Sequence, residues 1–148
     1  MTIGYEGHTP ATFFAQLTAH TIQTLVDIRE SPISRKAGFS KSALQAAANA
    51  HQIHYLHMRA LGCPRPIRND YREDKDWTGY TRRFLAHLDT QHDALNTLLQ
   101  RIEHERCCLL CLEADYHCCH RSLVAERLAQ MTSQHLSVIH LPTPNGAV

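Results

Sequence analysis

The sequence has no apolar run as long as the roughly 20 residues that a membrane-spanning helix needs, so we expect no membrane partner. It also lacks an excess of charge of either sign. Its 15 basic and 14 acidic side chains leave a formal net charge of +1, which excludes a general electrostatic attraction to nucleic acid. Residues 1–5 show no signal-peptide pattern, and we therefore expect a cytoplasmic protein.

The cysteines are also not distributed along the chain. Five of the six cysteines fall within residues 107–119, and the sixth is Cys63. Such crowding is a poor framework for disulfides, so we expect reduced thiols. The rest of the composition is globular, with 43% hydrophobic and 20% charged residues among 148, which predicts one domain over residues 1–148.

Short apolar segments alternate with helical patterns along this domain. Strands are predicted at residues 2–5, 24–29, 54–58, 107–112 and 137–141. The intervening segments carry helix starts, for example Thr9 followed by Pro10, and residues 79–105 form either one long helix or two. Strands separated by helices predict a single-domain, three-layer α/β fold with a mainly parallel sheet of about five strands flanked by helices.

One segment, residues 61–77, interrupts the alternation. It contains a glycine, two prolines and the mixed charges RNDYREDKD, so we predict a long polar loop. Loops of this length are often lids over a functional site, and a merely solvated, mobile loop is the alternative.

Polar side chains follow three of the predicted strands. In parallel α/β sheets ligands bind outside the carboxyl ends of the strands, so we expect these three loops to form one site. Glu6, Gly7 and His8 follow the first strand, and Asp27, Arg29, Ser31, Ser34 and Arg35 end or follow the second. Glu113, Asp115, His117, His120 and Arg121 follow the fourth.

The basic residues of these loops predict an anion site. Arg29, Arg35 and Arg121 can bind phosphate or carboxylate through paired N–H groups, and a helix start after residue 120 adds backbone donors. The alternative is that Arg29 pairs with Asp27, and Arg121 with Glu113, only to satisfy charge. The candidate anion-binding residues are Tyr5, Arg29, Ser34, Arg35, His120, Arg121 and Ser122.

The carboxylates Glu6, Asp27 and Glu113 can act as acid and base if their surroundings separate their pKa values, or can simply orient an arginine or cap a helix. Cys119 precedes a predicted helix beside His120, where a thiol pKa falls. The candidate catalytic residues are therefore Glu113, Asp27, Glu6 and Cys119.

A metal site is a further reading of the cysteines. Cys108 and Cys111 spell CxxC, but residues three apart on a strand point to opposite faces and cannot bind one ion. Cys111 and Glu113 do share a face, and with Cys119 and His120 they form a candidate set of metal ligands. Buried structural thiols are the alternative, and nothing in the sequence specifies an organic cofactor.

Four segments carry a family resemblance: TIGYEGHTP, LVDIRESPISRKAGFSK, IHYLHMRALG and LLCLEADYHCCHRSLVAERL. Together they resemble the bacterial and archaeal family labelled domain of unknown function 488, from residue 2 to about residue 141. The resemblance implies a compact α/β protein and no particular chemistry. After Gly62, where family members commonly continue with glycine or basic residues, this chain has CPRPIRND, which weakens the lid interpretation.

The matching residues are Gly4, Tyr5, Asp27, Arg29, Pro32, Ser34, Gly38, Phe39, Leu61, Gly62, Cys111, Glu113, Cys119, His120 and Arg121. Our first hypothesis is an enzyme that hydrolyses or transfers a group of a phosphate-bearing small molecule or nucleic acid component, as a monomer or a homodimer. The second is a non-catalytic anion-sensing or nucleic-acid-associated module. The third is a thiol or metal protein that uses the segment from Cys111 to His120.

Overall fold

A computed structural model describes residues 1–144 of the chain. Within them one sheet contains four strands, β1 (Thr2–Gly4), β2 (Thr24–Asp27), β3 (His54–His57) and β4 (Cys107–Cys111). The α-helices are α1 (Pro10–Ala19), α2 (Lys41–Ala50), α3 (Arg65–Asp74), α4 (Trp77–Leu88), α5 (His92–His104) and α6 (His120–Met131). Two short 3-10 helices are η1 (Arg59–Leu61) and η2 (Tyr116–Cys118). The predicted α/β class is confirmed.

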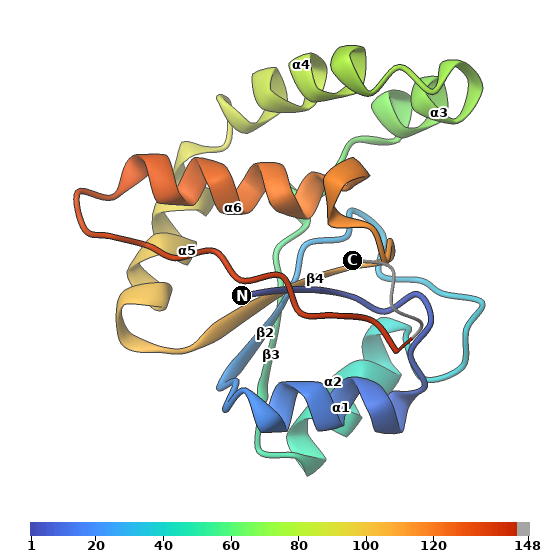
Figure 1. The fold of residues 1–148 in the computed structure, drawn as a ribbon, viewed down its shortest axis with the longest axis vertical. Helices are drawn as coiled ribbons and strands as arrows, with labels where there is room; N and C mark the ends of the chain where they lie inside the picture. The colour runs from blue at the N-terminus through green and yellow to red at the C-terminus, as the bar shows by residue number, and fades with distance from the viewer. Residues whose placement is uncertain (145–148) are drawn as a thin grey trace.

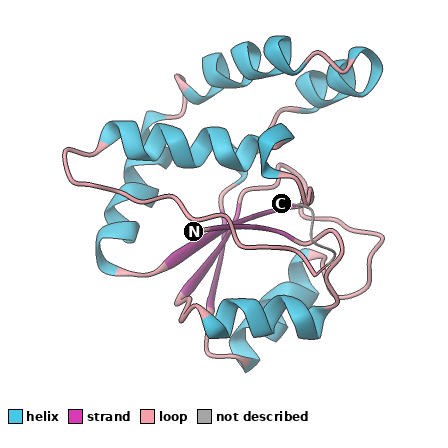
Figure 2. Cartoon of the chain, viewed as in Figure 1, coloured by secondary structure: helices cyan, strands magenta, loops and turns pink. Residues whose placement is uncertain are grey.

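The sheet, whose strands are magenta in Figure 2, is parallel throughout and has the order β1-β4-β2-β3. Strand β4 lies inside the sheet, between β1 and β2. Gly4 at the end of β1 pairs with Cys111 at the end of β4, while Asp27 at the end of β2 pairs with Leu110 and His57. Because parallel strands run in the same direction, all four carboxyl ends lie at one edge of the sheet.

Helices cover both faces of the sheet, as predicted. Helices α1 and α2 lie on one face, and α3 to α6 lie on the other (Figure 1). The buried strand β4 serves both cores, because successive side chains of a strand point to opposite faces. Cys108 and Leu110 pack into the core with α1 and α2, whereas Cys107 and Leu109 pack with α4, α5 and α6.

The fifth predicted strand, at residues 137–141, does not form. This segment runs beside β1 and makes one isolated bridge, between Thr2 and His140. The backbone N–H of Thr2 donates to the carbonyl of Ile139 at 2.9 Å, and that of Leu141 donates to the carbonyl of Thr2 at 2.8 Å. Ile139 remains 47% exposed, whereas all three residues of the neighbouring β1 are buried, so this edge segment lacks the burial that stabilises β1 as a strand.

The prediction of a long polar loop at residues 61–77 was wrong, because most of this segment is helix α3. Its prolines stand at the start of the helix, where a missing N–H costs no internal hydrogen bond. Ile67 and Tyr71, one helical turn apart, pack against the core that β4 forms with α4, α5 and α6. Helix α3 ends at Lys75, which adopts a left-handed conformation with φ of 55°.

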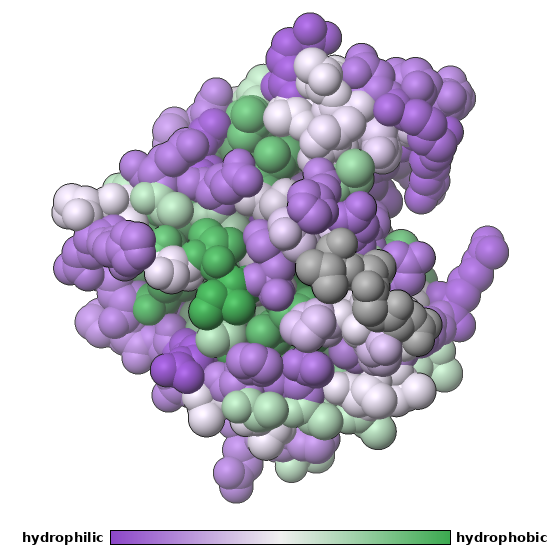
Figure 3. Space-filling model, in the orientation of Figure 1, coloured by the Kyte–Doolittle hydropathy of each residue, from purple (hydrophilic) through white to green (hydrophobic). Residues whose placement is uncertain are grey.

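The later helical region is divided rather than continuous. Asp76 caps α4 by accepting from the backbone N–H of Gly79 at 3.0 Å, and a break after Leu88 separates α4 from α5. Hydrophilic side chains dominate the end of the molecule formed by α3 and α4 (Figure 3). None of the helices within residues 1–144 combines the length and the apolar character needed to cross a bilayer.

Candidate functional site

A pocket of about 350 Å³ opens at the carboxyl edge of the sheet. The ends of β1, β2 and β4 all contribute to it, through Tyr5, Arg29 and Cys111 respectively. The fourth contribution comes from α3, whose Arg72 lies on its rim along with Lys75 after the helix end. One pocket therefore receives residues from three strand ends and from the segment that the sequence suggested was a lid.

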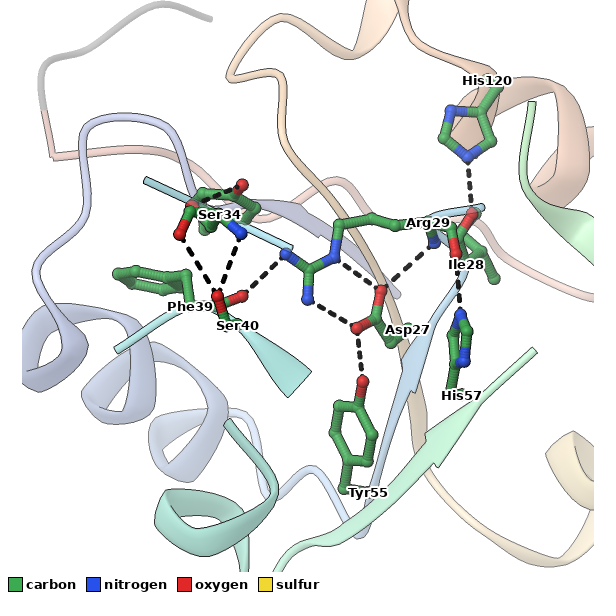
Figure 4. Close-up of polar contacts among 10 residues, drawn as sticks. Asp27, Ile28, Arg29, Ser34, Phe39, Ser40, Tyr55, His57 and His120 are labelled. Atoms are coloured by element: carbon green, nitrogen blue, oxygen red, sulfur yellow. Dashed lines mark hydrogen bonds and ion pairs between the residues drawn. The ribbon is translucent and has the colours of Figure 1, made fainter. Parts of the chain in front are cut away.

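The Arg29 guanidinium is bound by the protein itself (Figure 4). Its Nε and Nη2 donate to the two oxygens of Asp27 at 2.8 and 2.7 Å, and Nη1 donates to the carbonyl of Phe39 at 2.7 Å. Burial by itself lowers the pKa of Arg29, but the Asp27 carboxylate outweighs it and the pKa is raised. The alternative reading, an Arg29–Asp27 ion pair, is the arrangement observed.

Asp27 is fully buried, and both of its carboxylate oxygens accept hydrogen bonds from other residues of the protein. It also accepts the hydroxyl of Tyr55 at 2.5 Å, and burial raises the pKa of that phenol, which keeps it a donor. Asp27 does not line the pocket. It positions Arg29, and the catalytic role that the sequence suggested for it has no free oxygen to work with.

Arg121 is also completely buried and spans the loop after β4. It donates to the backbone carbonyls of Glu113 and Ala114, with Nη2 3.1 Å from the latter, and to the hydroxyl of Thr2 at 3.3 Å. Its Nη1 lies 3.5 Å from Sγ of Cys111. Arg121 thus holds the loop, and it does not meet Arg29 and Arg35 around a shared anion as predicted.

Gly4 allows this loop to approach the sheet. A Cβ atom at this position would lie 1.8 Å from the carbonyl oxygen of Glu113 and 3.1 Å from Nη1 of Arg121. Only a residue without a side chain fits between β1 and the loop.

Four side chains with ligand chemistry converge at the floor of the pocket. One donor atom from each of Cys111, Glu113, Cys119 and His120 lies within 4.8 Å of the others. Sγ of Cys111 is 2.9 Å and Sγ of Cys119 is 3.2 Å from the same oxygen, Oε2 of Glu113. Cys111, Cys119 and His120 are buried and Glu113 is exposed, and all of them except Cys119 line the pocket.

The orientation of the His120 ring is set by the main chain. Nε2 lies 2.9 Å from the carbonyl oxygen of Ile28, so this nitrogen carries a proton and donates it (Figure 4). Nδ1 then faces the cluster, 4.0 Å from Sγ of Cys119, and the ring packs edge-on against Phe84.

The ionisable groups of the cluster shift one another. Burial raises the pKa of Cys111 well above its usual value. Burial also opposes ionisation of Cys119, but hydrogen bonds with Cys111 and His120 outweigh it and lower the pKa of Cys119 to about 6. The pKa of Glu113 is lowered despite its desolvation, because it accepts from Cys111 and lies near His120. The pKa of His120 is raised against its burial by the Cys119 sulfur.

The other predicted site residues are placed outside this floor. Glu6 accepts from the backbone N–H of Ala114 at 2.9 Å and ties the loop down, and Ser122 donates to the carbonyl of Cys119 at 2.8 Å. Ser34 accepts from the hydroxyl of Tyr5 at 3.1 Å, while the exposed Arg35 does not line the pocket.

The pocket-lining residues that the sequence did not place in the candidate site lie on or beside α3. Arg68, Arg72 and Lys75 bring positive charge to the pocket, and Tyr71 brings an aromatic ring. Prolines at a helix start and apolar residues four apart were the available signals for this helix, but the density of charge favoured a loop.

Comparison with known proteins gives a family and no activity. No curated protein and no solved structure matches the chain. A family model described as domain of unknown function DUF488 matches residues 9–128, which include α3 and all four side chains at the pocket floor. The chain therefore belongs to the DUF488 family of domains of unknown function.

Proposed function

We propose that the protein is an enzyme that hydrolyses or transfers a group of a phosphate-bearing small molecule, such as a nucleotide or a nucleic acid component, in this pocket. The observation that carries the proposal is the pairing of a reactive floor with a cationic rim in one cavity. A volume of about 350 Å³ lies within the range of small-molecule sites.

The rim provides the charge that a phosphate needs. Arg68 is neutralised by Glu30, with Nη2 2.6 Å from Oε2, and Arg29 is neutralised by Asp27. Arg72 and Lys75 are exposed, and neither forms an ion pair with another residue in the described range 1–144. These two cations replace Arg35 and Arg121 in the proposed anion site.

The floor provides an acid and base. Glu113 is the solvent-exposed member of the cluster, Arg121 holds its backbone in place, and Gly4 leaves room for that backbone. In a hydrolysis, Glu113 accepts a proton from the attacking water, and its conjugate acid returns that proton to the leaving oxygen. Arg72 and Lys75 offset the negative charge of the phosphate group as the bond breaks.

Ligand binding is tested by thermal unfolding with phosphate, sugar phosphates, nucleotides and short oligonucleotides. A ligand at about a hundred times its dissociation constant stabilises the folded protein by roughly 2.7 kcal/mol, which raises the unfolding midpoint. Arg72→Gln and Lys75→Gln should abolish the increase. Arg65→Gln, on α3 but away from the pocket, is the matched control and should keep it. Equal loss in all three variants would argue against a specific rim.

Turnover is tested with the compounds that bind. Glu113→Gln keeps the size of the side chain and removes its basicity, so the rate should fall by about 10²- to 10⁴-fold while ligand binding persists. Binding without turnover by the wild-type protein would instead assign a non-catalytic anion-sensing module.

A further inference from the structure

The floor of the pocket combines the side-chain types that bind transition metals. Two thiols, an imidazole and a carboxylate contribute one donor atom each, all within 4.8 Å of one another. Donor atoms around a tetrahedral zinc ion lie roughly 3–4 Å apart, since metal–ligand bonds are about 2.0–2.3 Å long. The side chains are therefore already gathered to nearly the size of such a coordination shell.

We propose that Cys111, Glu113, Cys119 and His120 bind a divalent metal ion of the zinc class in tetrahedral geometry. The sulfur and nitrogen donors select a borderline-soft ion over magnesium or calcium, which prefer shells of oxygen ligands. Metal binding is independent of the identity of the substrate, so this inference and the proposed activity can fail separately.

The hydrogen bonds between the candidate ligands and residues outside the cluster fit metal binding. A metal-binding histidine usually donates its other ring N–H to a carboxylate or a backbone carbonyl, which directs the free nitrogen at the ion. His120 does this through Nε2 and the carbonyl of Ile28, and its Nδ1 faces the sulfur of Cys119. Nη1 of Arg121, 3.5 Å from Sγ of Cys111, is placed to support a thiolate.

Charge in the cluster points the same way. The sulfur atoms of two buried cysteines lie within 3.2 Å of one carboxylate oxygen. Ionised together, these groups would repel each other strongly, because charges interact more strongly where water is excluded. Arg121 contributes one positive charge but directs most of its donors to backbone carbonyls and to Thr2. A divalent cation would neutralise the remainder.

Glu113 has a particular place among the four ligands. Cys111, Cys119 and His120 are buried, and Glu113 is the solvent-exposed ligand among those that line the pocket. Catalytic zinc sites commonly have three protein ligands and a fourth position for water or substrate. Glu113 is therefore the ligand that a water molecule or a substrate oxygen would displace, which frees the carboxylate to act on that molecule.

The test uses the full-length protein, purified with a reducing agent, loaded with excess Zn²⁺ and desalted. Metal analysis should find about one equivalent per chain. Loading with Co²⁺ should produce the visible bands of a tetrahedral ion and thiolate-to-metal charge transfer with the intensity of two thiolates. Removing the metal with a chelator should lower the unfolding midpoint of the wild-type protein, which tests the site without any mutation.

Variants locate the ion. Cys111→Ser and Cys119→Ser should each weaken Zn²⁺ binding by more than about 100-fold, which exceeds the usual effect of losing an outer-shell partner. Cys118→Ser is the matched control, because Cys118 is an exposed neighbour outside the cluster. Glu113→Gln should weaken binding less than either cysteine variant and should keep both thiolate charge-transfer bands.

Several results would overturn the inference. One is that the wild-type protein, which needs no folding control, retains less than about a tenth of an equivalent of Zn²⁺ after loading under reducing conditions. Unchanged affinity in folded Cys111→Ser and Cys119→Ser proteins would place the ion elsewhere. A Cys111–Cys119 disulfide whose reduced form binds no metal would assign these thiols to redox chemistry instead.

Discussion

Arg121 and Glu113 are joined through the main chain and not through their opposite charges. Nη1 of Arg121 donates to the backbone carbonyl of Glu113, while the Glu113 carboxylate accepts from Sγ of Cys111 at 2.9 Å. The arginine therefore sets the position of the loop, and the carboxylate stays available at the pocket floor. The arginine that holds the loop is thus separate from the carboxylate that we propose as acid and base.

Arg121→Lys should destabilise the protein and loosen the site. Lysine cannot reach the two loop carbonyls and Thr2 together, so buried acceptors lose their donors, at a cost of about 2–4 kcal/mol. Urea unfolding measures the loss. Arg127→Lys on the same helix is the control, because its ion pair with Asp89 lies at the surface and should cost less than about 1 kcal/mol. Equal losses of stability in the two variants would contradict the role of Arg121 in holding the loop after β4.

Gly4→Ala should damage the same loop from the opposite side. The added methyl group would overlap the backbone oxygen of Glu113, and backbone cannot move aside as a flexible side chain can. We expect a loss of about 2 kcal/mol or more in the free energy of unfolding, together with weaker metal binding. In Gly79→Ala the new Cβ meets only the end of the Asp76 side chain, so a smaller loss is expected. A Gly4→Ala protein with the stability and metal binding of the wild type would refute the close approach of the loop to β1.

Arg29→Met should cost more stability than Tyr55→Phe. Removing the arginine leaves Asp27 as an unpaired charge with no exposure, at a cost of about 3–5 kcal/mol. Removing the Tyr55 hydroxyl leaves the ion pair intact and should cost about 1 kcal/mol. Denaturant unfolding of both variants provides the comparison. If Arg29 were an anion ligand instead, Arg29→Met would lose phosphate-induced stabilisation and keep the stability of the free protein.

Stability should depend on pH through His8. This side chain is buried, with Nδ1 3.2 Å from the hydroxyl of Thr12, and burial lowers its pKa below the usual value of about 6.5. As the pH falls through about 6.5, the unfolded chain therefore binds a proton that the folded chain does not, and stability is lost. The free energy of unfolding, measured between about pH 7 and pH 5, should fall more steeply for the wild-type protein than for His8→Phe. Parallel profiles would contradict this assignment.

Local pattern was sufficient for the architecture. Apolar segments of four to six residues, separated by segments with helix starts, predicted a parallel three-layer fold, because the two periods of apolar residues distinguish strands from helices. The rule for strand ends also predicted Tyr5, Arg29 and Glu113 at one edge of the sheet, and all three line the pocket. Helix α3 was not predicted, because its ten residues carry many charges and its stability depends on packing Ile67 and Tyr71 against the core.

The sequence by itself determined which residues reach the carboxyl edge of the sheet, because strand order along the chain and side-chain alternation are local properties. Only the tertiary structure decided which of them remain free to act. Arg29 and Arg121 carry the same guanidinium as Arg72, yet in the folded chain Asp27 and Phe39 bind the first and the loop after β4 together with Thr2 binds the second, whereas Arg72 stays exposed. Cys111 and Cys119 likewise become neighbours only because the loop between them folds back over β1, where Gly4 leaves room for it.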